Sequence, residues 1–105
     1  MNTITVKELN KKILSKEQFF LIDIREPYER NITKINHSIH IPMIDIPQAI
    51  KKFNKNDELI IMCRSGIRSE IICNYLEENN FTNVNNLTGG IIAWGKEIDP
   101  EITIY

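Results

Sequence analysis

Short apolar runs and segments with helical periodicity take turns along the chain. Five runs, of which the last is weak, have the length and residue types of β-strands. They are TITV at 3–6, FFLIDI at 19–24, SIHIP at 38–42, ELIIM at 58–62 and VNNL at 84–87. FFLIDI is almost continuously apolar, which is typical of a strand that helices cover on both faces. ELIIM is the run that we expect to be most buried.

Between these runs, apolar residues recur at intervals of three and four, the period of an amphipathic helix. Residues 6–14 follow this pattern after Thr5, which can cap the helix. Pro47 can open a short helix through Phe53, and a longer helix is expected from about Ser69 to Asn79. A last helical segment, IIAWGKEI, follows a TGG turn. The positions expected to face the core are Val6, Leu9, Ile13 and Leu14, then Ile46, Ile50 and Phe53, then Ile71, Ile72, Tyr75 and Leu76.

The alternation of strands and helices indicates the fold class. Strands that follow one another through helices need crossover connections, and these produce a parallel sheet with helices on both faces. We predict an α/β fold with a mainly parallel sheet of four or five strands. The length of 105 residues fits one domain over residues 1–105, in which residues 99–105 can form a flexible tail. The last five residues, EITIY, can alternatively add an edge strand or bind a partner.

Composition and charge limit the classes of function. The formal net charge is -1, so the chain as a whole has no electrostatic affinity for nucleic acid or an anionic membrane. No apolar run reaches the length of a membrane span, and the first residues, MNTITVKELNKK, lack the apolar core of a secretory signal. We therefore expect a soluble cytoplasmic protein whose two cysteines, Cys63 and Cys73, are thiols.

The segment CRSGIRS, which begins at Cys63, joins the most apolar run to a helix. Cys63 therefore lies at the carboxyl end of the expected strand, and in parallel sheets ligands bind beyond the carboxyl ends of the strands. The N–H groups of such a loop and of the first helical turn can surround an anion. Gly66 permits a left-handed backbone there, and Ser69 can cap the helix. Arg64 and Arg68 add positive charge beside the cysteine, so we expect a lowered pKa for its thiol and a reactive thiolate.

Three segments are similar to those of one known family. CRSGIRS resembles the active-site loop of the rhodanese family of sulfurtransferases, which runs Cys, two variable positions, Gly, one variable position, then often Arg and Ser. LIDIREPYE at 21–29 is similar to the family's strand and acidic turn, and LTGGIIAW at 87–94 to its terminal Gly-Gly and Trp segment. The segment TKINHS at 33–38 departs from the Gly-His-Ile and Gly-Ala pattern of many members. The three matches, in the family's order, imply a rhodanese-like domain.

The resemblance also implies a reaction. Cys63 would be the nucleophile whose thiolate takes the outer sulfur of a donor such as thiosulfate, releases sulfite and becomes a persulfide. The persulfide would pass its sulfur to a thiophilic acceptor such as cyanide, a thiol or a sulfur-carrier protein, without a metal or an organic cofactor. Loop N–H groups would hold the terminal sulfur, and two guanidinium groups would bind the anionic donor, favouring thiosulfate over a carboxylate donor. The residues concerned are Arg64, Ser65, Gly66, Ile67, Arg68 and Ser69, supported by Asp23 and Arg25.

Two alternative functions remain open at this point. Cysteine phosphatases and arsenate reductases also combine a cysteine, loop amides and an arginine, but they separate the Cys and the Arg by five residues. Four residues lie between Cys63 and Arg68, which suits a loop around a single sulfur atom better than one around a tetrahedral oxyanion. The second alternative is a non-catalytic module that uses the same fold to bind a partner, since fold does not fix function.

The remaining suggestive residues are interpreted as structural. Cys73 has apolar neighbours typical of a packed core residue. His37 and His40 are three apart on an expected strand and so face opposite sides, which does not favour a metal site. Trp94 and Tyr75 are expected in the core or in a pocket wall, without the basic surroundings of a nucleic-acid site.

Overall fold

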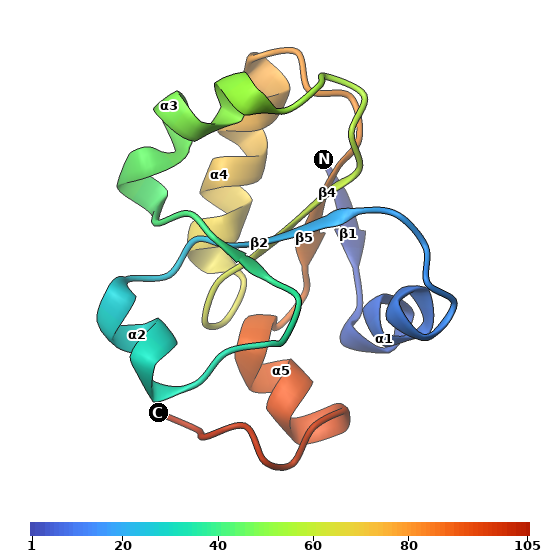
Figure 1. The fold of residues 1–105 in the computed structure, drawn as a ribbon, viewed down its shortest axis with the longest axis vertical. Helices are drawn as coiled ribbons and strands as arrows, with labels where there is room; N and C mark the ends of the chain where they lie inside the picture. Colours follow the sequence, from blue (N-terminus) through green and yellow to red (C-terminus); the bar gives the residue numbers. More distant parts are fainter.

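The computed structural model describes all 105 residues as an α/β domain built on a five-stranded sheet (Figure 1). The strands are β1 (Asn2–Ile4), β2 (Phe20–Asp23), β3 (Ile39–His40), β4 (Leu59–Met62) and β5 (Val84–Leu87). Every pairing is parallel, and the strand order is β1-β5-β4-β2-β3. The prediction of a parallel α/β sheet is therefore confirmed, with five strands.

Helices connect the strands and cover both faces of the sheet. They are α1 (Val6–Leu14), α2 (Pro27–Ile32), α3 (Ile46–Ala49), α4 (Ile67–Glu78) and α5 (Gly90–Glu97), with 3₁₀ turns at Met43–Asp45 and Ile50–Lys52. In Figure 1, α3 and α4 lie on one side of the sheet, α1 and α5 lie on the other, and α2 follows the carboxyl end of β2. None of these helices combines the length and the apolar composition that crossing a membrane requires.

The core consists of two layers, one on each side of β4. Leu59 and Ile61 pack in the layer beneath α3 and α4, whereas Ile60 and Met62 pack in the layer that α1 and α5 cover. All four side chains are fully buried. Side chains alternate between the two faces of a strand, so a strand between two helical layers needs apolar residues at every position. The run ELIIM is continuously apolar from Leu59 for this reason.

The first helix has the cap expected from the sequence. The Thr5 hydroxyl accepts a hydrogen bond from the N–H of Glu8 at 3.1 Å, and the Glu8 carboxylate accepts one from the N–H of Thr5 at 2.9 Å. This capping box satisfies two N–H groups that a helix start leaves unpaired. Val6 and Leu9 are buried as predicted, but the prediction for Leu14 is wrong, because its side chain is 73% exposed at the end of the helix.

The start of α4 differs from the prediction. The helix begins at Ile67 rather than near Ser69, and Gly66 occupies the cap position in a left-handed conformation, with φ of +105°. Ser69 is therefore inside the first helical turn, and its hydroxyl does not cap the helix. The left-handed backbone expected at Gly66 is confirmed, and it lets the chain turn from the strand into the helix within a few residues.

The inward face of α4 also differs from the prediction in one position. Ile71 is 55% exposed, whereas Cys73 is fully buried. A helix advances 100° per residue, so Ile71 points away from the face that contacts the sheet. The buried side chains of this helix are those of Ser69, Ile72, Cys73 and Leu76.

The segment between β2 and β4 contains less regular structure than expected. The predicted strand at 38–42 is reduced to the two residues of β3, and the predicted helix after Pro47 is a short α-helix between two 3₁₀ turns. Ile46 and Ile50 nevertheless face the core as predicted.

The residues after α5 return to the carboxyl end of the sheet, and the chain ends beside α2 (Figure 1). Ile102 is buried in the layer beneath α5, and the N–H of Thr103 donates to the hydroxyl of Thr33 at 3.3 Å. This segment forms no strand. Tyr105 is thereby placed beside α2, close to the loop that follows β4.

Candidate active site

Cys63 is the first residue after β4, and its sulfur lies inside the loop that leads to α4. The Sγ atom accepts hydrogen bonds from the N–H of Gly66 at 3.1 Å and the N–H of Ser69 at 3.4 Å. The Ser69 hydroxyl oxygen lies 3.3 Å from the same sulfur. Cys63 as a whole is only 1% exposed. The loop therefore surrounds the sulfur with donors and leaves a narrow approach to it.

These hydrogen bonds decide the acidity of the thiol. Burial alone would raise the pKa of Cys63, because an apolar environment disfavours the thiolate. Hydrogen bonds from the Ser69 hydroxyl and from the backbone N–H groups of Ser69, Gly66 and Ser65 outweigh burial, so the pKa is lowered. The sequence predicted this direction from the loop N–H groups and the charges of Arg64 and Arg68 together, and the hydrogen bonds of the loop are the main cause.

The carbonyl groups of the loop are paired with α5, away from the sulfur. The N–H of Ile91 donates to the Cys63 carbonyl at 3.0 Å, and the N–H of Ile92 donates to the Arg64 carbonyl at 3.2 Å. Gly90 makes this approach possible, because a Cβ atom there would lie 2.5 Å from both carbonyl oxygens. The free N–H groups at the start of α5 thus donate to the carbonyl groups of the loop. The N–H groups of the loop remain available to donate to the sulfur.

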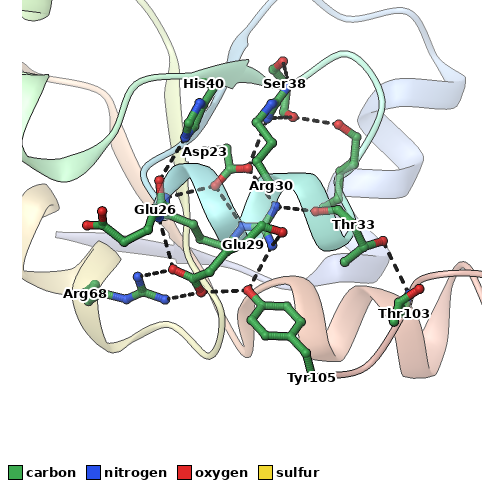
Figure 2. Close-up of polar contacts among 12 residues, drawn as sticks. Asp23, Glu26, Glu29, Arg30, Thr33, Ser38, His40, Arg68, Thr103 and Tyr105 are labelled. Carbon is green, nitrogen blue, oxygen red and sulfur yellow. Dashed lines mark hydrogen bonds and ion pairs between the residues drawn. The ribbon is translucent and has the colours of Figure 1, made fainter.

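Arg68 is paired with an acidic residue of α2. Its two terminal nitrogens donate to the two carboxylate oxygens of Glu29 at 2.7 and 2.8 Å (Figure 2). This pair, opposed by burial, lowers the pKa of Glu29 to about 2 and raises that of Arg68. The guanidinium expected to bind a donor is therefore already occupied by a carboxylate that is 2% exposed.

Tyr105 connects the end of the chain to the same cluster. Its hydroxyl donates to Glu29 at 2.7 Å (Figure 2). The same hydroxyl accepts from Arg25 at 2.9 Å. The guanidinium carbon of Arg64 lies 5.0 Å from the centre of the Tyr105 ring, within the range of a cation–π contact. Arg64 forms no ion pair, which distinguishes it from Arg68.

Asp23 and Arg25 form a buried ion pair at the carboxyl end of β2. Arg25 donates from Nε and Nη2 to the two carboxylate oxygens of Asp23 at 3.0 and 2.8 Å, and both side chains are fully buried. Arg30 donates to Asp23 at 3.0 Å and to the Ser38 hydroxyl at 3.0 Å (Figure 2). Arg25 also reaches Tyr105, so this ion pair lies next to the Glu29–Arg68 pair and away from direct contact with the sulfur.

The other residues singled out in the sequence are dispersed. Ser65 and Ile67 are exposed at the outer side of the loop, with Ile67 72% exposed. Cys73 lies in the core, where burial raises the pKa of its thiol to about 12. The His40 Nε2 lies 2.9 Å from the backbone oxygen of Arg25. His37 is in a left-handed turn. No group of three potential metal ligands is present.

Three residues of this site were missed in the sequence. Asn86 of β5 is 5% exposed, donates from Nδ2 to the Gly66 carbonyl at 3.1 Å and accepts from the Ser69 hydroxyl. Glu29 and Tyr105 were also not identified, although Glu29 stands in the quoted segment LIDIREPYE. The chain is rich in asparagine, so a single asparagine carries little signal. The only indication that Asn86 is buried was its position in the expected strand, next to Leu87.

Comparisons with known proteins agree with this geometry. The family described as Rhodanese-like domain matches residues 5–97. YtwF of Bacillus subtilis is 40% identical over 98 residues, which are 93% of this chain and 94% of that protein. A protein named Sulfurtransferase from Allochromatium vinosum is 36% identical over 96 residues, 91% of this chain and 90% of that one. The crystal structure of a rhodanese-like domain protein from Staphylococcus aureus superposes with a TM-score of 0.86 at 35% identity, over 100% and 99% of the two chains. This chain therefore belongs to the rhodanese-like domain family.

Proposed function

We propose that this protein is a sulfurtransferase that carries sulfur as a persulfide on Cys63, with thiosulfate as donor. The observation that carries the proposal is the surrounding of the sulfur by the N–H groups of Gly66 and Ser69 at 3.1 and 3.4 Å. Donors arranged in advance stabilise an anion on the reacting atom. Family membership and the relative named Sulfurtransferase support sulfur transfer in general.

The proposed reaction has two steps. The Cys63 thiolate attacks the outer sulfur of thiosulfate, a sulfur–sulfur bond forms, the sulfur–sulfur bond of the donor breaks, and sulfite leaves with the bonding electron pair. A thiophilic acceptor, such as cyanide, a thiol or a sulfur-carrier protein, then attacks the outer sulfur of the persulfide. That attack breaks the bond to Sγ and regenerates the thiolate. No net oxidation of the protein occurs over the cycle.

The two arginines of the loop have unequal parts in this proposal. Arg64 has no carboxylate partner and only stacks on Tyr105, so its guanidinium is available for the sulfonate end of the donor. Arg68 must exchange or share Glu29 before it binds the donor. Donor binding therefore depends first on Arg64 and second on the strength of the Arg68–Glu29 pair.

The test is the intact mass of the protein after incubation with thiosulfate. The expected result is a gain of one sulfur atom that a thiol reductant removes. Cys63→Ser should show no gain and no transfer, because a hydroxyl is a far poorer nucleophile than a thiolate. Cys73→Ala is the matched control, since it removes the other cysteine of the chain and should gain sulfur like the parent protein. A parent protein that gains no sulfur and instead binds a protein partner would point to the non-catalytic module.

A further inference from the structure

A row of three side chains connects the nucleophile to β5. The Cys63 sulfur lies 3.3 Å from the hydroxyl oxygen of Ser69, and that hydroxyl donates to the Oδ1 atom of Asn86. The Nδ2 atom of Asn86 donates to the Gly66 carbonyl at 3.1 Å. Cys63, Ser69 and Asn86 are 1%, 0% and 5% exposed. Water has almost no access to this row, so each hydrogen must be shared among the side chains themselves.

The orientation of the Asn86 amide follows from its partners. The Gly66 carbonyl can only accept a hydrogen bond, so the NH₂ group of Asn86 must face it. The amide oxygen of Asn86 then faces Ser69, and this oxygen can also only accept. As long as Cys63 is a neutral thiol, the single hydroxyl hydrogen of Ser69 therefore points to Asn86. Toward the sulfur, Ser69 presents its lone pairs, which suit a neutral Cys63 whose S–H donates to them.

This arrangement does not suit a thiolate. A thiolate only accepts hydrogen bonds, and lone pairs on the Ser69 oxygen would face its negative charge. The hydroxyl can turn its hydrogen to the sulfur, but the buried oxygen of Asn86 then loses its only donor. Leaving a buried acceptor unpaired costs free energy. The Cys63 sulfur and the amide oxygen of Asn86 therefore compete for the one hydroxyl hydrogen, and only one of them can accept it at a time.

We propose that Asn86 is a positioning residue that competes with the Cys63 sulfur for the hydroxyl hydrogen of Ser69. This inference rests on the proposed function. In the free thiolate, the hydroxyl hydrogen points to Sγ. In the persulfide, the negative charge has moved to the outer sulfur, Sγ is a neutral atom with two bonds, and the hydrogen returns to Asn86. When the acceptor breaks the sulfur–sulfur bond, charge returns to Sγ and the hydroxyl turns back to stabilise it.

The test is a titration of the Cys63 thiolate by its ultraviolet absorbance in four proteins: the parent, Asn86→Leu, Ser69→Ala and the double variant. Leucine has nearly the shape of asparagine but cannot accept the hydrogen. With Ser69 present, Asn86→Leu should raise the ratio of thiolate to thiol several-fold at a pH below the midpoint. With Ala at position 69, Asn86→Leu should give no such rise. Loss of the hydrogen bond to the Gly66 carbonyl is common to both backgrounds, so it cancels in the comparison.

Asn85→Leu is the matched control, because Asn85 is the neighbouring residue of β5 and its side chain contacts Asn83 rather than the loop. It should leave the titration unchanged. An equal effect of Asn86→Leu in both backgrounds, or a fall in the ratio only when Ser69 is present, would overturn the proposal. Should Asn86→Leu not fold, Asn86→Ala removes the amide without adding bulk and replaces it in the same comparison. The titration uses no sulfur donor, so its outcome is separate from that of the persulfide mass measurement.

Discussion

Arg68 holds both carboxylate oxygens of Glu29 with its two terminal nitrogens, at 2.7 and 2.8 Å, although Arg68 lies in the first turn of α4 and Glu29 lies in α2. A planar guanidinium and a carboxylate match each other in this two-bonded geometry. The positive charge that the loop offers to an anionic donor is therefore set by α2 as well as by the loop.

Removal of the Glu29 charge should strengthen donor binding. In Glu29→Gln the guanidinium of Arg68 keeps an acceptor but loses its counter-charge, so the KM for thiosulfate should fall several-fold in steady-state transfer assays. Glu26→Gln is the control, because Glu26 is an exposed carboxylate only three residues away. It should change KM far less. An unchanged or higher KM in Glu29→Gln would contradict the proposed role of Arg68.

The Arg68–Glu29 pair should make the free energy of unfolding depend on pH in the acidic range. The pKa of Glu29 is about 2 in the folded protein against an ordinary 4.5, chiefly because of Arg68, so the folded state binds its proton less readily than the unfolded state. The stabilisation is complete above pH 4.5 and is lost as the pH falls toward 2. Urea unfolding at pH 6, 4 and 3 should show this loss in the parent protein. In Glu29→Gln it should be reduced, and parallel pH curves for the two proteins would refute the prediction.

The two cysteines should titrate in separate pH ranges. The pKa of Cys63 is lowered by hydrogen bonds from the loop that outweigh its burial, whereas burial raises the pKa of Cys73 to about 12. Thiolate absorbance should therefore rise below the pH typical of a free cysteine. Cys63→Ser should abolish that rise, and Cys73→Ala should retain it. If the low-pH rise persisted in Cys63→Ser, Cys63 would not be the thiol with the lowered pKa.

Gly90→Ala should destabilise the protein by about 2–4 kcal/mol, from a left-handed backbone and a steric clash. Gly90 has φ of +58°, and its added Cβ would meet two backbone carbonyl oxygens that have little freedom to move. Gly95→Ala is the control in the same helix, where φ is ordinary and the new Cβ meets only side-chain atoms of Ile102 and Ile104. Chemical denaturation measures both. Equal losses would contradict the role given to the contact between α5 and the loop.

Tyr105→Phe should cost about 1–2 kcal/mol, because the carboxylate of Glu29 and the guanidinium of Arg25 each lose a partner. Tyr28→Phe removes the same hydroxyl from a side chain that is 65% exposed, and it should change stability by less than about 0.5 kcal/mol. Thermal or urea unfolding of the two variants provides the comparison. A Tyr105→Phe variant as stable as Tyr28→Phe would show that the end of the chain contributes little.

The sequence predicted those features that depend on neighbouring residues. The cap at Thr5, the buried run of β4 and the left-handed turn at Gly66 each follow from a few consecutive positions. The start of α4 was placed too late because Ser69 has the chemistry of a cap. Its hydroxyl instead contacts the Cys63 sulfur and donates to Asn86 of β5.

The parts of the site that depend on distant residues escaped prediction. Ser69 and Asn86 are 17 positions apart, and Glu29 and Tyr105 are 76 positions apart. Ser69 and Asn86 come together only when α4 packs on the assembled sheet, and Glu29 and Tyr105 only when the last residues of the chain reach α2. The occupation of Arg68 by Glu29 likewise depends on how α2 packs against α4, which local patterns do not determine.

The near-complete burial of Cys63 has a consequence for the order of encounters in the proposed cycle. A donor reaches Sγ only through the small part of its surface that is open, since the cysteine is 1% exposed. The sulfur that it leaves behind must then lie on that open side, about 2 Å farther out, the length of a sulfur–sulfur bond. Loading thus brings the electrophilic atom toward the surface, so a bulky acceptor can approach the loaded protein more closely than the empty one.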